Sequence, residues 1–367
     1  MFGLSKTKLR IETSARPSKE RVTVLLPVLN EADRIGPCLA ALCQQPEEVH
    51  EILVIDGGSS DDTQAIVQRQ QRLDARVRLI DASPVDPRWT GKAWGLYQGL
   101  QSSAAISDWI LCVDADVGVQ PQLVRSLLHH AQRSGVKIFS VATAQRLSGY
   151  LDAVIHPAML TTLIYRFGSP GRATANRHRV QANGQCFFAP REVLLRTEAF
   201  QAAQSSLCED ITIARRLAAC GEPIGFYESA GLVEVKMYDS WRATWNNWPR
   251  SLPMRDQYFG WREALALLGV LLVQALPLPI LILATLLNWP LPVVIIGGFF
   301  LLLRLGVLCG TARAYPGRPW SYWLSPLADL AVVLRIIQFA LRRQQSWRGR
   351  TYRRGKGGVF EPVGDNQ

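Results

Sequence analysis

The ten residues 109–118, WILCVDADVG, decide the fold class of this chain. The first half of the stretch is apolar and is typical of a buried β-strand. Two carboxylates follow one residue apart, Asp114 and Asp116, although the whole chain has a net charge of +11. The pattern predicts a strand that ends in a small acidic loop, and the residues around it indicate what the loop binds.

Other short apolar runs precede and follow this strand, and helical patterns lie between them. The alternation predicts an α/β domain with a mostly parallel sheet and helices on both faces. Ligands of such sheets bind beyond the carboxyl ends of the strands, where we expect both Asp56 and the pair Asp114/Asp116 to lie. The predicted strands are 22–26, 51–55, 77–80, 109–113 and 137–143, and the predicted helices begin near Glu31, Thr63, Gly91 and Pro121.

The acidic pair suits a divalent cation. Mg²⁺ and Mn²⁺ prefer oxygen ligands, and in nucleotide sites they commonly take one or two carboxylates together with substrate phosphates. We therefore predict that Asp116 and Asp114 hold a metal–diphosphate complex. A solvated loop or a helix cap is the alternative for an isolated Asp-x-Asp sequence.

The C-terminal third is predicted to lie in a membrane. Residues 264–303 contain no charged side chain, and Asn288-Trp289-Pro290 interrupts them. A helix crosses the hydrocarbon core with roughly 20 apolar residues, so we predict a membrane hairpin over residues 264–309, with a buried core hairpin as the alternative. The third apolar segment, 322–341, includes Asp329 and Arg335, and charges inside a membrane are costly. We expect this segment to enter part-way or to lie in the interface; a third crossing is the alternative.

The flanks of the hairpin carry interfacial signals. Residues 238–261 contain four Trp among Arg, Asn and Pro, a composition typical of the headgroup layer. Residues 342–356 carry seven basic groups and no acidic one, which favours the cytoplasmic membrane face. Nucleic-acid binding is the competing explanation, but the position after an apolar segment favours lipid. We expect no signal peptide in the first twenty residues, and the seven scattered Cys suit a reducing cytoplasm.

Five stretches, in chain order, resemble glycosyltransferase family 2, whose members are inverting enzymes with a GT-A fold. They are LLPVLNEADRI (25–35), ILVIDGGSSDDT (52–63), DAD (114–116), NGQCFFAPREVL (183–194) and CEDITIARRLAACG (208–221). The resemblance implies that Asp210 is the catalytic base, with Glu209 beside it, and that Asp56 contacts the nucleotide base. For Glu209-Asp210 the alternative is first-turn charge that complements the helix dipole.

Two departures from the family pattern weaken parts of this assignment. Gly57 stands where the family has a second acidic residue, so Asp56 alone is left for base recognition. The Q-x-x-R-W motif of processive synthases is replaced by WNNWPRS (245–251), in which Arg250 either neutralises diphosphate or lies at the membrane surface.

The stretch DPRWTGKAWGLYQG (86–99) resembles a signature of membrane-associated members that glycosylate lipophilic alcohols, above all the carotenoid glycosyltransferases of phototrophic bacteria. The tail SWRGRTYRR (346–354) resembles the ending of hopanoid-associated members. Lys92 is expected near the donor phosphates, with an exposed lysine at a helix start as the alternative.

The sequence and its resemblances therefore imply an inverting transfer of one sugar from a nucleotide-diphosphate sugar to a hydroxyl of a lipophilic acceptor, a carotenoid first and a hopanoid or other glycolipid second. We expect the reaction at the cytoplasmic face of the cytoplasmic (or thylakoid) membrane, with Mg²⁺ or Mn²⁺. A polyprenyl-phosphate sugar synthase and a catalytically silent membrane scaffold are the alternatives. The predicted parts are a tail (1–20), a GT-A domain (21–237), an interfacial segment (238–261), a membrane region (262–341) and a basic cytoplasmic tail (342–367). The predicted donor residues are Pro27, Asn30, Glu31, Asp56, Lys92, Asp114 and Arg250, and the predicted acceptor residues are Asn183, Gly184, Gln185, Trp245 and Trp248.

Overall fold

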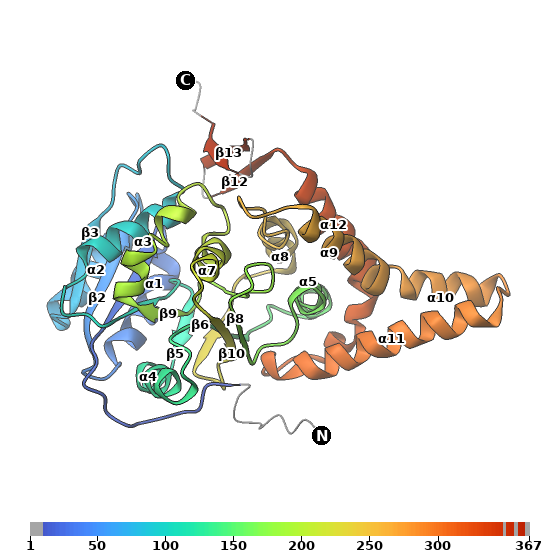
Figure 1. Cartoon of the computed structure of the whole chain (residues 1–367), viewed down its shortest axis with the longest axis horizontal. Coiled ribbons are helices and arrows are strands. Elements are labelled where there is room, and N and C mark those ends of the chain that lie inside the picture. The colour runs from blue at the N-terminus through green and yellow to red at the C-terminus, as the bar shows by residue number, and fades with distance from the viewer. Residues whose placement is uncertain (1–9, 348–349, 356–358, 364–367) are drawn as a thin grey trace.

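The computed structural model describes residues 10–347, 350–355 and 359–363. An α/β domain forms the broad part of the molecule, and a long helical hairpin projects away from it (Figure 1). The C-terminal strands return to the α/β domain at its upper edge in this view (Figure 1). The chain therefore leaves the α/β domain to form the hairpin and then returns to the domain.

The domain is built on a sheet in which β1, β2, β3 and β4 run parallel to one another, as predicted. Its strand order is β3-β2-β1-β4-β9-β6-β10-β8. The strands are β1 (Val22–Val28), β2 (Val49–Asp56), β3 (Val77–Asp81), β4 (Trp109–Cys112), β6 (Ile138–Ala142), β8 (Arg172–Thr174), β9 (Phe187–Pro190) and β10 (Ile224–Glu228).

Strand β9 departs from the simple alternation, because it lies antiparallel between β4 and β6. The sheet remains mostly parallel, since β6 and β10 also pair in parallel. A second, three-stranded sheet, β5-β11-β7, continues from the acidic loop. Its strands are β5 (Val117–Val119), β7 (Ala144–Gln145) and β11 (Val233–Val235).

Helices cover both faces of the sheet because successive strand residues point to opposite sides. On one face Val24 and Leu26 of β1 pack with α1, α2 and α4, and on the other Leu25 packs with α3, α6 and α7. These helices are α1 (Ala32–Cys43), α2 (Thr63–Leu73), α3 (Gly91–Ser102), α4 (Leu123–Ser134), α6 (Arg191–Arg196) and α7 (Glu209–Ala219). Helix α3 lies unusually close to the sheet, because a Cβ at Gly99 would lie 2.8 Å from Ile55 Cδ1.

The predicted interfacial segment bridges the domain and the hairpin. It forms α8 (Trp241–Asn247) and the short 3₁₀ helix η3 (Trp248–Arg250). Trp248 is buried in a cluster with α5 (Asp152–Phe167), α9 (Trp261–Val270) and α12 (Asp329–Leu341), whereas Trp261 is exposed. The segment therefore packs on protein through part of its aromatic residues.

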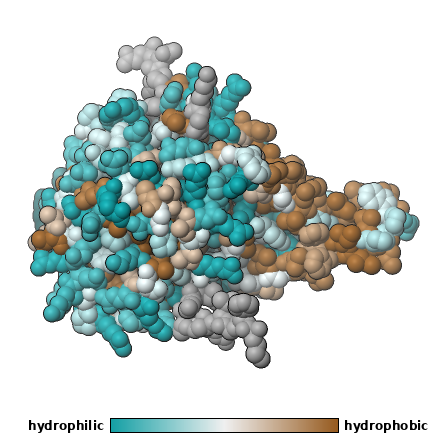
Figure 2. Space-filling view, viewed as in Figure 1, coloured by the Kyte–Doolittle hydropathy of each residue, from teal (hydrophilic) through white to brown (hydrophobic). Residues whose placement is uncertain are grey.

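The hairpin consists of α10 (Pro277–Leu286) and α11 (Leu291–Thr311), joined at the predicted turn. Its first arm is not one straight helix: α9 and the π-helical η4 (Leu271–Ala275) meet α10 at a bend of 41°. Apolar side chains cover the projecting surface in Figure 2. Among them are Ile282, Leu286, Ile295, Phe299 and Leu302, all about half exposed or more.

Two helices within the described residues are long and apolar enough to cross a membrane, Leu291–Ala314 and Trp320–Leu341, and the bent pair adds a third when counted as one span. The second of these is η6 (Trp320–Ala328) continued by α12. Asp329, at the start of α12, is paired: Arg304 Nε lies 2.7 Å from Asp329 Oδ2. Length and composition alone leave the membrane position of residues 322–341 a prediction.

The predicted basic tail is folded. Strands β12 (Gln344–Trp347), β13 (Arg350–Arg354) and β14 (Phe360–Pro362) form an antiparallel sheet. The Phe360 N–H donates to the Ser205 carbonyl of the α/β domain at 3.0 Å. The tail is therefore attached to the domain rather than extended from it.

Candidate active site

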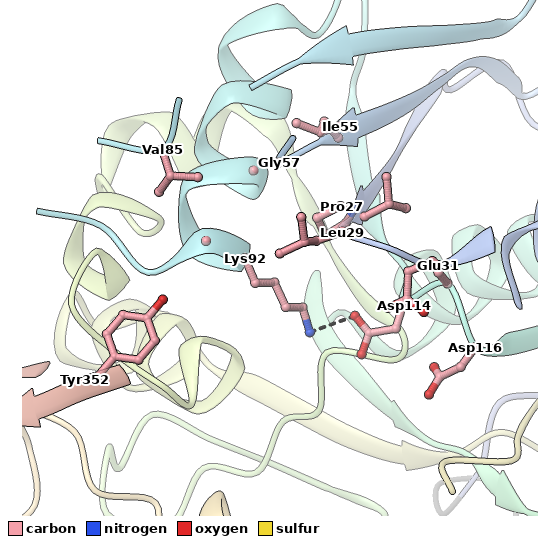
Figure 3. Close-up of a pocket in the computed structure, with 14 residues that line it drawn as sticks. Pro27, Leu29, Glu31, Ile55, Gly57, Val85, Lys92, Asp114, Asp116 and Tyr352 are labelled. Carbon is pink, nitrogen blue, oxygen red and sulfur yellow. Dashed lines mark ion pairs between the residues drawn. The ribbon is translucent and has the colours of Figure 1, made fainter. Parts of the chain in front are cut away.

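The ends of β1, β2 and β4 and the start of α3 border one cleft, as the strand order requires. Its inner part, about 150 Å³, is lined by Pro27, Gly57, Lys92, Asp114 and Asp116 (Figure 3). The cleft widens to about 590 Å³ where Glu209, Asp210, Asn183, Trp248 and Arg250 border it. The structure thus brings predicted donor, metal, base and acceptor residues to one cleft.

Lys92 is the charge at the centre of the cleft. It stands in the first turn of α3, and its Nζ lies 2.7 Å from Asp114 Oδ1 and 2.7 Å from Glu209 Oε1. Burial alone would lower the pKa of Lys92, but these two carboxylates outweigh burial and leave the pKa well above its usual value. Lys92 therefore stays charged, and it lies in the cleft where it would contact an anionic ligand.

Gly184 leaves the space in which the Lys92 head lies. A Cβ built on Gly184 would lie 2.4 Å from Lys92 Nζ and 3.4 Å from Asp114 Oδ2. Because Nζ is the end of a flexible side chain, a larger residue would displace the ammonium group rather than the fold. Gly184, which was predicted to border the acceptor, therefore also leaves the space that the Lys92 ammonium group occupies.

The acidic loop fits a divalent cation. Asp116 Oδ1 is buried and has no hydrogen-bond partner, and the nearest cation is the Arg34 guanidinium, with Nη1 4.0 Å from Oδ2. Burial and the neighbouring Asp114 raise the pKa of Asp116 to about 7. Within the described ranges no cluster of three or more His, Cys, Asp or Glu could hold a metal. The loop therefore suits an ion that brings further ligands with it, such as phosphate oxygens.

Asp210 lies at the start of α7, facing the cleft. Its Oδ1 accepts a hydrogen bond of 2.8 Å from the Ile211 N–H. Burial and the adjacent Glu209 raise the pKa of Asp210 to about 7. A carboxyl with such a pKa is suited to accept a proton near neutrality. Glu209 is 9% exposed and engages Lys92, so the two adjacent acids have different partners.

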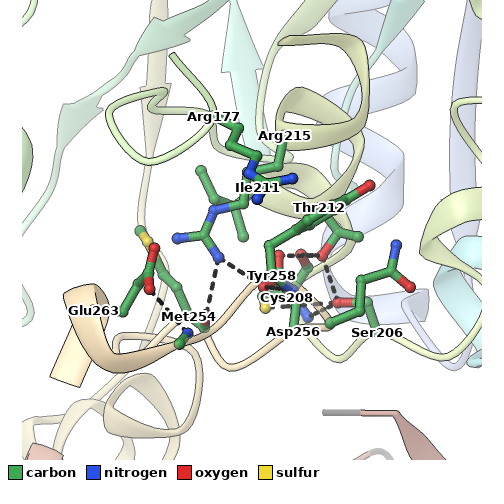
Figure 4. Close-up of polar contacts among 12 residues, drawn as sticks. Arg177, Ser206, Cys208, Ile211, Thr212, Arg215, Met254, Asp256, Tyr258 and Glu263 are labelled. Carbon is green, nitrogen blue, oxygen red and sulfur yellow. Dashed lines mark hydrogen bonds and ion pairs between the residues drawn. The ribbon is translucent and has the colours of Figure 1, made fainter. Parts of the chain in front are cut away.

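A buried network fixes α7 to the segment that leads to the hairpin (Figure 4). Arg215, fully buried, places Nη1 2.7 Å from Asp256 Oδ1. The Thr212 hydroxyl donates to Asp256 Oδ2 at 3.0 Å. Removing one partner of a buried ion pair typically costs about 3–5 kcal/mol. Helix α7, which carries Asp210, is therefore tied to residues that continue into α9.

The loop after β1 is hydrogen-bonded to the segment between β2 and α2. Asn30, at φ 54°, accepts a hydrogen bond from the Ser60 N–H at 2.8 Å, and the Glu31 N–H donates to Thr63 Oγ1 at 2.8 Å. Asn is among the residues that tolerate such a left-handed backbone. Both residues border the wide part of the cleft.

Asp56 has a different environment from the one expected. Its carboxylate is fully buried and accepts hydrogen bonds from Ser59 and from the Gln64 amide at 2.5 Å. Its neighbour Gly57 borders the cleft instead. The contact between Asp56 and a nucleotide base remains a prediction, and the structure shows Asp56 shaping the loop.

The predicted acceptor residues separate into two groups. Asn183, Gly184, Gln185, Trp248 and Arg250 border the cleft. Trp245 packs instead against the hydrophobic cluster formed with α5, α9 and α12, where the Arg335 guanidinium lies 5.6 Å from its ring. Sequence reasoning did not predict a place in the cleft for Arg34 or Tyr352: Arg34 had only its place after Asn30-Glu31 as a signal, and Tyr352 had only its place in the resembling tail stretch SWRGRTYRR.

Comparison with known proteins agrees with this architecture. A mannosyltransferase from Pyrobaculum calidifontis, solved with GDP-Man and Mn²⁺, has a TM-score of 0.51 and 18% identity, covering 89% of this chain and 90% of that chain. The 4,4'-diaponeurosporenoate glycosyltransferases of Staphylococcus aureus (strain MRSA252) and Staphylococcus haemolyticus are 26% and 23% identical, over 63% and 60% of this chain. This chain spans about 60% and 58% of the length of those relatives.

The fold is a GT-A fold, like that of the mannosyltransferase. Residues 23–201 match the family model described as Glycosyl transferase family 2.

Proposed function

We propose that this protein transfers one sugar from a nucleotide-diphosphate sugar to a lipophilic acceptor at a membrane surface, with inversion. The observation that carries the proposal is the cleft itself, where Lys92 and Asp116 face one end and Asp210 the wider end. An inverting transfer needs both a site for the leaving diphosphate and a base for the acceptor.

The donor end is assigned to the diphosphate. Lys92 and Arg34 supply positive charge there, and Asp116, with Asp114, would hold the divalent cation. When bound, such a cation stabilises the negative charge of the departing diphosphate. The Lys92–Asp114 contact keeps the ammonium and the carboxylate in place before any ligand enters.

Asp210 is assigned as the base that takes the acceptor proton as oxygen attacks the anomeric carbon. The name of the staphylococcal relatives denotes a carboxylate acceptor, which carries no such proton near neutrality. A base at Asp210 has a role only with an acceptor that carries a proton, so the proposal takes a hydroxyl acceptor for this chain, a carotenoid alcohol first and another membrane lipid alcohol second. Trp248 and the neighbouring Met237 and Tyr238 give that end of the cleft aromatic and apolar surface.

The membrane orientation is part of the proposal. Tail strands β12–β14 and the α/β domain contact each other, through Phe360 and Ser205 among others. Two parts in contact lie on the same side of a membrane, so the number of crossings between them is even. Val332 and Ile336 of α12 pack on Ala158 and Met159 of α5, which supports an interfacial place for residues 322–341. Positive charge then favours the cytoplasmic side.

The test is a transfer assay with the full chain in nanodiscs, Mn²⁺ and radiolabelled UDP-glucose or GDP-mannose. Acceptors are a carotenoid alcohol, a carotenoid acid and a polyprenyl phosphate. We expect label in a product with the alcohol that survives mild acid. If the only labelled product were acid-labile and formed with polyprenyl phosphate, the proposal would be wrong and the protein would be a polyprenyl-phosphate sugar synthase. If neither transfer nor donor hydrolysis occurred, the proposed activity would be wrong and the catalytically silent membrane scaffold would be the remaining alternative.

A further inference from the structure

One side chain of the C-terminal strands enters the donor end of the cleft. Tyr352, on β13, is 1% exposed and lines the same cavity as Pro27, Gly57 and Lys92 (Figure 3). Figure 3 shows Tyr352 on the side of Lys92 away from Asp116. The ring therefore stands at the end of the cavity opposite the metal-binding loop.

The sheet that carries Tyr352 and the start of α3 are hydrogen-bonded to the same segment. On one side β14, which pairs with the strand of Tyr352, donates from the Phe360 N–H to the Ser205 carbonyl at 3.0 Å. On the other side Thr90, just before α3, donates from its N–H to the Gln204 carbonyl at 2.7 Å and from its hydroxyl to the Ser206 carbonyl at 2.9 Å. Residues 204–206 thus set the position of Tyr352 relative to Lys92.

The space around Tyr352 is large enough for more than the phosphates. A second cavity, of about 450 Å³, adjoins the first and shares Gly57, Val85 and Tyr352 with it. The rest of its lining comes from Gly58, from the loop 83–89 with its Ser, Pro, Asp and Trp side chains, and from Thr351 and Val363 of the C-terminal segment. If the diphosphate lies at Lys92 and Asp116, the part of the donor that extends past Lys92 in this direction is the nucleoside.

We propose that Tyr352 is a donor-binding residue whose ring contacts the nucleobase of a nucleoside diphosphate. This inference rests on the proposed function, because it takes the diphosphate to lie at Lys92. Every nucleobase has a flat apolar face, and contact between such a face and an aromatic side chain contributes to affinity without a hydrogen bond. The C-terminal sheet then forms a wall of the active site and is part of the catalytic unit.

The test compares nucleoside diphosphates with a ligand that has no base. Titration calorimetry measures UDP, GDP and inorganic pyrophosphate, each with Mn²⁺, on the full chain in detergent. Tyr352→Leu keeps an apolar side chain of similar burial but removes the ring, and Tyr352→Phe removes only the hydroxyl. We expect Tyr352→Leu to weaken UDP or GDP binding by about tenfold, to leave pyrophosphate binding unchanged, and Tyr352→Phe to bind like the unaltered protein.

Phe360→Leu is the matched control. Phe360 is 3% exposed on β14 and is not among the described residues that line either cavity. Its substitution perturbs the same sheet without touching the ligand, so we expect near-normal binding. Equal affinities of Tyr352→Leu and the unaltered protein for UDP and GDP would overturn the inference alone. An equal loss for pyrophosphate would also overturn it, since it would show a general displacement. Absence of nucleotide binding by the unaltered protein would overturn the proposed function as well.

Discussion

Lys92 Nζ lies 2.7 Å from Glu209 Oε1 and so connects the first turn of α3 to the first turn of α7. The two helices carry the groups assigned to opposite halves of the reaction: the cation for the diphosphate on α3 and the base Asp210 on α7. Lys92 also contacts Asp114, so its ammonium group sets the spacing between the loop that carries Asp114 and Asp116 and helix α7, which carries Asp210.

The first prediction concerns the metal loop. Asp116→Ala is expected to abolish Mn²⁺-dependent nucleotide binding while the protein still folds and inserts, because its Oδ1 has no hydrogen-bond partner to lose. Calorimetric titration with UDP or GDP and Mn²⁺ measures this. Asp108→Ala is the control, since Asp108 is an exposed carboxylate that precedes the same strand, at its other end. Undiminished binding by Asp116→Ala would refute the metal assignment.

The second prediction concerns Gly184. We expect Gly184→Ala to fold normally and to weaken nucleotide binding several-fold, because the added methyl would occupy the place of Lys92 Nζ, 2.4 Å away. Thermal unfolding and calorimetry together separate the two effects. Gly36→Ala is the control: Gly36 lies in α1 and a Cβ there meets nothing within 4 Å. Normal binding by Gly184→Ala would show that the Lys92 position tolerates displacement.

The third prediction is a pH dependence. Only the deprotonated form of Asp210 can accept a proton, and its pKa is about 7. Turnover under saturating substrate should therefore rise as pH increases through about 7. After burial, the Glu209 charge is the next largest cause of the raised pKa, so Glu209→Gln should move this rise to lower pH. A rise at unchanged pH in Glu209→Gln would mean that another group controls the profile.

The fourth prediction tests the orientation. Single cysteines at Ser102 and Gly355, in a chain whose exposed Cys220 and Cys309 are replaced by Ser, should both react with a membrane-impermeant maleimide only from the cytoplasmic side. The contact between the C-terminal strands and the domain is the reason. Labelling of Gly355→Cys from outside, with Ser102→Cys inside, would require an odd number of crossings.

The strands that form the cleft could be predicted because each is a short apolar run followed by a polar loop; β1 to β4 begin or end within a few residues of the prediction. The family resemblance then indicated Asp114, Asp116 and Asp210, all of which border the cleft. Strand β9 was harder to place, since an antiparallel insertion leaves no trace in local periodicity.

Contacts between residues far apart in the chain could not be predicted from the sequence. Lys92–Glu209 and Arg215–Asp256 join residues whose spacing carries no pattern. The composition of the tail indicated lipid through its basic residues, which stays a prediction, but it gave no sign that Tyr352 between them lies buried beside the cleft. The hydrogen bonds that Asp56 accepts from Ser59 and Gln64 also join residues that no sequence pattern pairs, and its contact with a nucleotide base stays a prediction.

The central claim is that Asp210 removes the acceptor proton, and transfer by Asp210→Asn measures it most directly. General-base catalysis is worth roughly 10²–10⁴-fold, so Asp210→Asn should lose turnover by that factor with a hydroxyl acceptor and Mn²⁺, while nucleotide binding stays normal. Glu209→Gln should lose less. If Asp210→Asn transferred sugar to the hydroxyl acceptor as fast as the unaltered protein, Asp210 would not be the base and the proposed mechanism would be wrong.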